Sequence, residues 1–339
     1  MKLQGRVKAG ARTKNLVKFL CSGDIAVIRH DDIDEMAALA IVRTGVKAVI
    51  NTGKSMTGRF SAVGALTLLQ YNVKVIDVSL PLDQFKDNDM ITVLDNDIII
   101  RNYIYKNVCT LVNWDYISKR QLVSKENENR EILKFIDNTV NHAASEMHKL
   151  ICFTGYPEIN TKLEGRHVVV VVRNSSSVEE INALKSYIEK INPIFIGVDG
   201  GADLIINSGY SPDILIGDMD SVSDIGIYKS KEIILHAYED GYCPCLGRIA
   251  AMNVPYKILA MRGTSEDAAL MLSYHKNAVL IVLVGGHSCM YDFMCKGRPG
   301  MASTFIARTL IGSKLVDCKG FGIIAASENE GKDAQWMKM

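Results

Sequence analysis

Two aspartates one residue apart, Asp218 and Asp220, follow an apolar run in the stretch SPDILIGDMDSVSD. In an extended Asp-x-Asp segment both side chains point to the same side, so both carboxylates can reach one cation. Mg²⁺ binds one or two carboxylates and completes its shell with water and phosphate oxygens. The pattern therefore predicts a magnesium site with a nucleotide polyphosphate as the third partner. The alternative is that the aspartates, with Ser221, cap the next segment.

Two more acidic groups follow other apolar runs. Asp199-Gly200-Gly201 ends the run PIFIGVD, and its glycines would let a phosphate approach the backbone closely. Thr264-Ser265-Glu266-Asp267 opens a helix soon after the run YKILA. Ligands of open parallel sheets bind beyond the carboxyl ends of the strands, so we expect one site there. The residues predicted to bind nucleotide or phosphate at this edge are Gly200, Gly201, Gly217, Ser221, Thr264, Ser265 and Asp267.

A basic loop lies further along the chain. Lys296-Gly297-Arg298 precedes a helix expected to begin near Pro299, where charge and backbone N–H groups could grip a phosphate. We add Lys296 and Arg298 to the predicted phosphate-binding residues. The alternative is a simple helix start, because proline in the first turn is an ordinary signal for one.

The elements that must position these residues can be inferred from apolar periodicity. Six near-continuous apolar runs in the second half are typical of strands buried on both faces, which predicts a doubly wound, mostly parallel sheet. The runs span 167–172, 193–199, 213–218, 232–237, 256–260 and 278–286. The first half reads as smaller β-α-β units with strands at 24–28, 46–51 and 73–78.

The expected domain organisation has four parts. Residues 91–124 suggest a small β subdomain, and residues Asp32 and Glu35 a helix capping box. Apolar residues at three- and four-residue spacing predict a long helix that joins the halves or packs against a second copy. The predicted parts are 1–125 (α/β and β region), 126–150 (connecting helix), 151–320 (α/β domain) and 321–339 (tail).

Composition limits the function classes. A formal net charge of +1 argues against a specific nucleic-acid binder, although the first twenty residues are basic. They suggest a solvated tail, and the alternative is a segment that binds anionic lipid or nucleic acid. Eight scattered cysteines without Cys-x-x-Cys spacing fit free thiols in a reducing cytoplasm. No apolar run approaches the roughly 20 residues that a membrane span needs.

The acidic motifs resemble a known catalytic core. GVDGGADLIINSGYSPDILIGDMDSVSD is similar to thiamine pyrophosphokinases, whose pattern is Asp-Gly-Gly, about a dozen residues, then Pro-Asp-x-x-x-Gly-Asp-x-Asp-Ser. Those enzymes transfer a pyrophosphoryl group from Mg·ATP to thiamine. The resemblance implies that Asp199, Asp218 and Asp220 are catalytic and surround the metal and the phosphates.

A second resemblance covers about residues 12–320. TKNLVKFLCSGDIAVIRHDDIDEMAA, GTSEDAALML and KGRPGMASTFIARTLIGSKLVD look like the SteA-like family of bacterial cytokinetic ring proteins. Members join a family-specific N-terminal region to a pyrophosphokinase-like domain, and many end in a membrane-spanning helix. The resemblance implies a role in cell division, at the septum or on the membrane through a partner or a missing C-terminal segment.

Two departures from the thiamine pyrophosphokinase pattern argue against thiamine turnover. Arg262-Gly263-Thr264-Ser265-Glu266-Asp267 stands where the enzymes have Asp-x-Thr-Asp, and only about fifty residues follow VGGH, too few for their thiamine pocket. We therefore expect a homodimeric, cytoplasmic protein that binds Mg²⁺ and ATP without turning over thiamine. The alternatives are an active thiamine diphosphokinase or related diphosphotransferase, and a non-catalytic assembly module.

Overall fold

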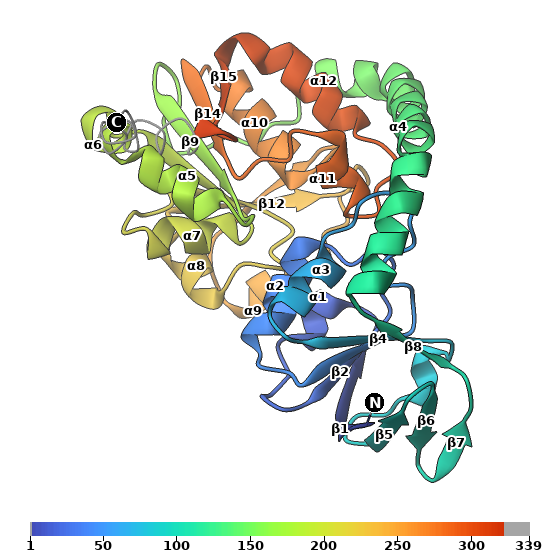
Figure 1. Cartoon of the computed structure of the whole chain (residues 1–339). Coiled ribbons are helices and arrows are strands. Elements are labelled where there is room, and N and C mark those ends of the chain that lie inside the picture. Colours follow the sequence, from blue (N-terminus) through green and yellow to red (C-terminus); the bar gives the residue numbers. More distant parts are fainter. Residues whose placement is uncertain (1, 322–339) are drawn as a thin grey trace, which may run out of the picture. The chain divides into compact units, whose positions relative to one another are not determined.

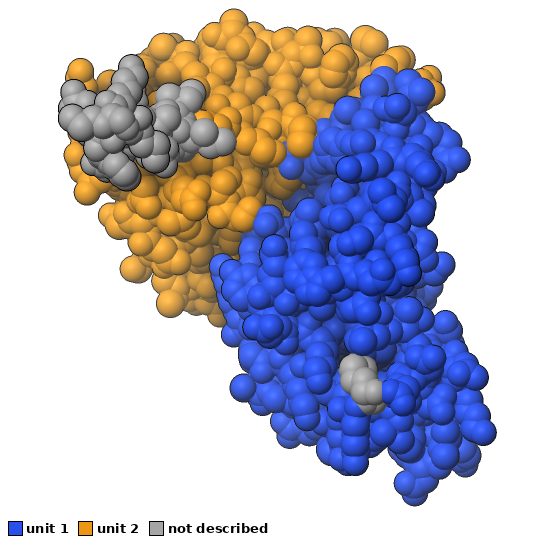
Figure 2. Space-filling model, viewed as in Figure 1, with its two compact units in different colours: residues 1–136, 290–299 blue, residues 137–289, 300–339 orange. Residues whose placement is uncertain are grey.

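The computed structural model describes residues 2–321, which fall into two compact units (Figure 2). Unit 1 comprises Met1–Ile136 with Met290–Pro299, and unit 2 comprises Asp137–Cys289 with Gly300–Met339. The division falls within the long helix α4 (Trp114–Ile151) rather than at the expected boundaries before 126 and after 150. Apart from Phe321, the predicted tail lies outside the described residues.

Unit 1 is built on an eight-stranded mixed sheet of order β7-β6-β5-β1-β2-β3-β4-β8. Strands β1 to β4 are parallel neighbours, β5 pairs antiparallel with β1, and β8 pairs antiparallel with β4 (Figure 1). The strands are β1 (Lys2–Gly10), β2 (Ile25–Ile28), β3 (Ala48–Asn51), β4 (Lys74–Val78), β5 (Met90–Leu94), β6 (Asp97–Ile100), β7 (Tyr103–Tyr105) and β8 (Cys109–Val112). The helices are α1 (Thr13–Leu16), α2 (Glu35–Arg43), α3 (Gly64–Gln70), the N-terminal part of α4, and α11 (Met290–Met294), with a short 3-10 turn at Leu82–Gln84.

Apolar side chains cover both faces of this sheet. Helices α1, α2 and α3 pack on one face, where Ile28, Val49 and Val75 are buried. On the other face, Val27 and Ile50 pack against strands β5 and β6. Strands β2, β3 and β4 match the predicted ones to within two residues, because strands buried on both faces produce the apolar runs that sequence analysis detects.

Three expectations for unit 1 were wrong. The basic N-terminal segment is not a solvated tail: β1 pairs with β2 on one side and β5 on the other, with Leu3 and Val7 buried. The β subdomain expected over residues 91–124 is shorter and spans only residues 90–112. Helix α4 begins at Trp114, because the Asn113 side chain accepts a hydrogen bond from the Tyr116 amide.

The third concerns the start of α2. Its N-cap is Asp34, which accepts from Ala37 N at 2.8 Å. Asp32, the predicted cap, has φ +53° and accepts hydrogen bonds from the amide and the hydroxyl of Thr57. The carboxylate that looked like a cap therefore joins two loops.

Unit 2 is a doubly wound sheet of seven parallel strands in the order β13-β12-β11-β10-β9-β14-β15. The strands are β9 (His167–Val172), β10 (Ile194–Val198), β11 (Ile214–Gly217), β12 (Glu232–Ala237), β13 (Lys257–Ala260), β14 (Leu280–Val284) and β15 (Leu315–Asp317). The helices are the C-terminal part of α4, α5 (Ser177–Ala183), α6 (Lys185–Ile191), α7 (Gly201–Asn207), α8 (Asp224–Lys229), α9 (Leu246–Ala251), α10 (Ser265–His275) and α12 (Ala302–Ile311), with a 3-10 turn at Gly312–Lys314.

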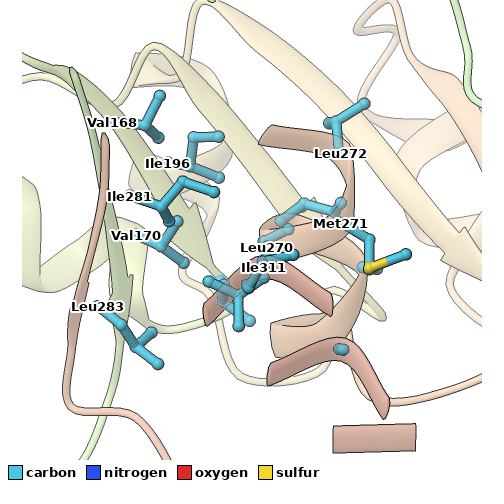
Figure 3. Packing of buried hydrophobic residues seen from close by; sticks show 14 of the residues in the cluster. Val168, Val170, Ile196, Leu270, Met271, Leu272, Ile281, Leu283 and Ile311 are labelled. Carbon is cyan, nitrogen blue, oxygen red and sulfur yellow. The ribbon is translucent and has the colours of Figure 1, made fainter. Parts of the chain in front are cut away.

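Helices cover the two faces of this sheet separately. Successive strand residues alternate between faces: Val168 and Val170 face α10 and α12, whereas Val169 and Val171 face α5 and α6. Figure 3 shows the first face, where Ile196 and Ile281 meet Leu270 of α10. The chain order reverses between β9 and β14, where α10 crosses back over the sheet. The predicted mixed α/β class and mostly parallel sheet are confirmed; β15 was not predicted.

Candidate functional site

The carboxyl edge of the unit 2 sheet brings two of the predicted groups together. Asp199 to Gly201 follow β10, and Gly217 to Ser221 end and follow β11, the adjacent strand. The third group, Thr264 to Asp267, follows the edge strand β13 and begins α10. All three lie beyond strand ends that point the same way, as expected for a parallel sheet.

Asp199 fixes the loop that follows β11. Its backbone is left-handed, with φ +48°, and its Oδ1 accepts a hydrogen bond from Met219 N at 2.9 Å. A Cβ atom added to Gly217, which has φ +154°, would lie 2.0 Å from this Oδ1. The carboxylate therefore occupies the space that any side chain at position 217 would need.

The Asp-x-Asp segment is a turn, and the prediction of an extended geometry was wrong. Met219 has φ +59° and a fully buried side chain, which packs among the apolar residues beneath α8 and α9. Asp218 Oδ1 accepts from Asp220 N at 3.0 Å, as in an Asx turn. Burial of the methionine leaves the two aspartates at the surface, where both are exposed.

Two residues that the sequence analysis did not select hold the backbone of this acidic loop, which we define as residues 217–224. Arg248 on α9 donates to the carbonyl oxygens of Met219 and Val222 and pairs with Asp224. Asp203 on α7 accepts from the amide and the hydroxyl of Ser223. Side chains from α7 and α9 thus hold the loop backbone in one conformation, from which its two aspartates extend to the surface.

Close packing of the chain requires Gly201, which follows β10. A Cβ on Gly201 would lie 1.9 Å from the Val171 carbonyl oxygen, so α7 begins in contact with β9. A Cβ on Gly200 would lie 2.8 Å from Cζ of Arg173, and its amide donates to the Ser221 hydroxyl at 3.3 Å. Arg173, exposed after β9, makes no ion pair among residues 2–321, and it was not predicted. It places a cation beside Gly200, whose amide contacts Ser221 of the acidic loop.

Asp267 is a structural residue in this arrangement. It forms a capping box with Thr264, and its Oδ2 also accepts from the hydroxyls of Ser303 and Thr304. The side chain is fully buried, and burial, with the nearby charge of Glu266, raises its pKa. Its Oδ1 has no hydrogen-bond partner among the described residues. Direct contact between Asp267 and a nucleotide does not fit this position.

Ser265 contacts a histidine that the sequence analysis passed over. His236, on β12, lies with Nε2 2.8 Å from the Met261 carbonyl oxygen and Nδ1 3.1 Å from the Ser265 hydroxyl. A carbonyl only accepts, so Nε2 carries the proton and Nδ1 accepts from the serine. Burial lowers the pKa of His236, and the charges of Asp267 and Asp218 offset part of that effect. The histidine is therefore neutral near pH 7.

Glu266 and His287 form a buried network rather than an open site. The His287 amide and Nδ1 both donate to Glu266 Oε2, and Arg308 donates to Oε1. Burial opposes the charge of Glu266, but His287 and Arg308 outweigh it and lower the pKa of this carboxyl. The network joins α10 to the end of β14 and to α12.

Lys296 and Arg298 belong to unit 1, whereas the acidic loop belongs to unit 2. Both are exposed, and α12 begins at Ala302 rather than near Pro299. Their predicted role as phosphate ligands stays a prediction.

The acidic loop offers a cation two carboxylates, not a closed cage. Among residues 2–321, no group of three or more His, Cys, Asp or Glu side chains is placed to hold a metal ion. Asp199 is turned into the loop by its bond to Met219, while Asp218 and Asp220 stay exposed. This donor set suits an Mg²⁺ ion that brings phosphate oxygens and water with it.

Comparisons with known proteins find partial structural similarity. A thiamine pyrophosphokinase from Bacillus subtilis is 18% identical with a TM-score of 0.26, over 39% of this chain and 52% of that one. The 3-isopropylmalate dehydratase LeuD from Methanocaldococcus jannaschii is 18% identical with a TM-score of 0.25, over 37% of this chain and 99% of that one. The chain thus spans about half the length of the pyrophosphokinase. No family model and no curated protein matches the chain, and the SteA-like resemblance stays a prediction.

None of the helices within residues 2–321 is both long and apolar enough to cross a membrane.

Proposed function

We propose that unit 2 binds a nucleotide polyphosphate together with Mg²⁺ at the acidic loop. The observation that carries the proposal is a pair of exposed carboxylates, Asp218 and Asp220, on a loop whose backbone is fastened by Asp199, Asp203 and Arg248. Fixed backbone geometry lowers the cost of ordering a site when a ligand binds.

Each residue has a distinct role in this proposal. Asp218 and Asp220 would hold the cation, and Arg173 and the Ser221 hydroxyl would contact phosphate oxygens. Bound Mg²⁺ would neutralise phosphate charge and orient the phosphate chain. Asp199 and Arg248 are positioning residues, since they act on the ligand only through the loop.

Binding without thiamine turnover is favoured over a diphosphotransferase. Glu266 and Asp267, the acids nearest to the third motif of the pyrophosphokinases, are 5% and 0% exposed and serve helix packing. Within residues 2–321, only α11, α12, the 3-10 turn at Gly312–Lys314 and the short β15 follow β14, so a thiamine pocket of the pyrophosphokinase kind has no counterpart in the described part.

A role in bacterial cell division, through self-association, is the second part of the proposal and rests on the SteA-like resemblance. Helix α4 supports self-association because several of its apolar side chains are exposed. They are Leu122, Leu133, Ile136, Val140 and Met147. Of these, 133, 136, 140 and 147 follow the heptad spacing of a helix that packs against a second copy.

Calorimetric titration of the full chain with ATP, with and without Mg²⁺, tests the first part. We expect saturable binding that needs Mg²⁺ and weakens in Arg173→Gln, with no AMP formed when thiamine is added. Binding that is equal with and without Mg²⁺ would refute the site, and thiamine-dependent AMP would make the chain an enzyme.

Light scattering of the full chain tests the second part. We expect a dimer that dissociates in Leu133→Glu or Val140→Glu. A monomer at all accessible concentrations would contradict self-association through α4.

A further inference from the structure

Unit 1 contains a polar cavity of about 550 Å³ that the nucleotide site does not involve. Its walls come from the carboxyl ends of three adjacent parallel strands, β2, β3 and β4, closed by β8 and the first turns of α4. Its volume lies within the range of about 300–1,000 Å³ that is usual for small-molecule sites. The lining residues are Arg29, Asp31, Thr52, Gly53, Lys54, Thr57, Asp77, Val78, Ser79, Thr110, Tyr116 and Arg120.

Buried polar contacts fix the shape of this cavity. The fully buried Asn51 accepts from the amides of His30 and Gly53 and donates to the His30 carbonyl and to Ser55. It therefore joins the loops that follow β2 and β3. Ser55 in turn donates its hydroxyl and amide to Asp77 at the end of β4. Three strand ends are thus connected by one hydrogen-bond network.

The lining of the cavity holds an excess of positive charge, because three cations, Arg29, Lys54 and Arg120, stand against two acids, Asp31 and Asp77. Arg29 and Lys54 make no ion pair with any residue of the described chain, and both are exposed. The two acids of the lining already have protein donors: Asp31 accepts from Lys54 N at 2.7 Å, and Asp77 accepts from Ser55. Unpaired cations in a concave site favour an anion.

The lining of the cavity is rich in hydroxyl groups and poor in apolar surface, which favours a small polar ligand. The hydroxyls of Ser79 and Thr110 have no hydrogen-bond partner within the described residues. The Arg120 guanidinium lies over the Tyr116 ring, 5.4 Å from its centroid, and Val78 is the only aliphatic side chain of the lining. Arg120 thus covers one face of the Tyr116 ring, and the ring also packs against the apolar cluster beneath helices α1 to α3, which disfavours stacking of a nucleobase there.

We propose that this cavity binds a small hydroxylated dianion, held by Arg29, Lys54 and Arg120 through its phosphate or carboxylate groups and by Ser79 and Thr110 through its hydroxyls. An arginine fork can contact two oxygens of such a group at once, and a lysine adds a point charge. This site is separate from the acidic loop in residues, unit and ligand charge pattern.

Titration calorimetry of the full chain with glycerol 3-phosphate and with tartrate tests the proposal and distinguishes a phosphate from a carboxylate ligand. We expect saturable binding of at least one of them. Arg29→Gln and Lys54→Gln should each weaken it by about tenfold, the typical effect of losing one charged hydrogen bond. Lys74→Gln, at the opposite end of β4, is the matched control and should change affinity by less than about twofold.

The two proposals can fail independently. Asp218→Asn/Asp220→Asn removes the acidic loop carboxylates and should leave dianion binding unchanged. Absence of saturable binding for both ligands, or equal affinity in wild type, Arg29→Gln and Lys54→Gln, would overturn the proposal. Arg29 and Lys54 are exposed, so their substitution should leave the fold intact, which circular dichroism can verify.

Discussion

The Oδ1 atom of Asp199 lies 2.0 Å from the point where a Cβ of residue 217 would be, so the carboxylate of one strand end depends on a glycine at the next. Gly217 and Asp199 therefore act as a pair. This pair also sets the conformation of the acidic loop, because Asp199 Oδ1 accepts a hydrogen bond from the Met219 amide at 2.9 Å.

Gly217→Ala should destabilise unit 2 by about 1–3 kcal/mol, the usual size of local backbone strain. The new methyl group would collide with Asp199, and the backbone at φ +154° disfavours a side chain. Replacing Asp199 by Gly as well removes the collision, and glycine tolerates the left-handed backbone there. In urea denaturation the double variant should lose less stability than the sum of the single ones. Additive effects would mean that the pair does not interact.

Arg248→Lys should weaken Mg²⁺-dependent nucleotide binding while changing stability little. Lysine keeps the charge but cannot donate to two carbonyl oxygens and a carboxylate in one plane. The Asp218 and Asp220 side chains would remain, but on a less ordered loop. Calorimetry should give a lower affinity with an unchanged requirement for Mg²⁺. Wild-type affinity in this variant would exclude Arg248 as a positioning residue.

The titration of Asp77 should lower the free energy of unfolding of unit 1 as the pH rises from about 4 to about 6. Burial raises the pKa of Asp77 to about 6, although hydrogen bonds from Ser55 and Tyr116 and the charge of Arg120 oppose the shift. In that pH window the folded chain holds the proton that the unfolded chain has released, so increasing pH favours unfolding. The resulting loss of unfolding free energy is on the order of 2–3 kcal/mol, and no further loss occurs above the pKa that Asp77 has in the folded chain.

Comparison of wild type with Asp77→Asn isolates this effect from other titrations. Fluorescence of Trp114, which lies in unit 1, reports unfolding when Trp336 is replaced by Phe. The stability of wild type relative to Asp77→Asn should fall between pH 4 and pH 6. A stability difference between the two proteins that is constant with pH would show that Asp77 has the same pKa in the folded and the unfolded chain.

The sequence predicted the parallel strands well because burial on both faces leaves a local signature, as in HVVVVV of β9. It did not predict β1, because the basic residues of KLQGRVKAG make the segment polar overall although Leu3 and Val7 are buried. The Asp-x-Asp turn was also missed, because the left-handed conformation of Met219 follows from a tertiary contact that buries its side chain.

Long-range partners explain the rest of what was missed in the site. Arg248 is 29 residues from Met219, and His236 is 29 residues from Ser265, so no local pattern connects them. The cavity of unit 1 is similar, since Arg29, Lys54 and Arg120 come from three separate segments. Only the fold brings these residues to one strand edge.

The measurement that tests the central claim most directly is the Mg²⁺ dependence of ATP affinity in Asp218→Asn and Asp220→Asn. Glu164→Gln is the control, an exposed acid before the amino end of β9. We predict that each aspartate variant loses the Mg²⁺-dependent part of binding while its fold is retained, and that the control binds as wild type does. Unchanged, Mg²⁺-dependent affinity in both aspartate variants would contradict the assignment of the acidic loop as the nucleotide site.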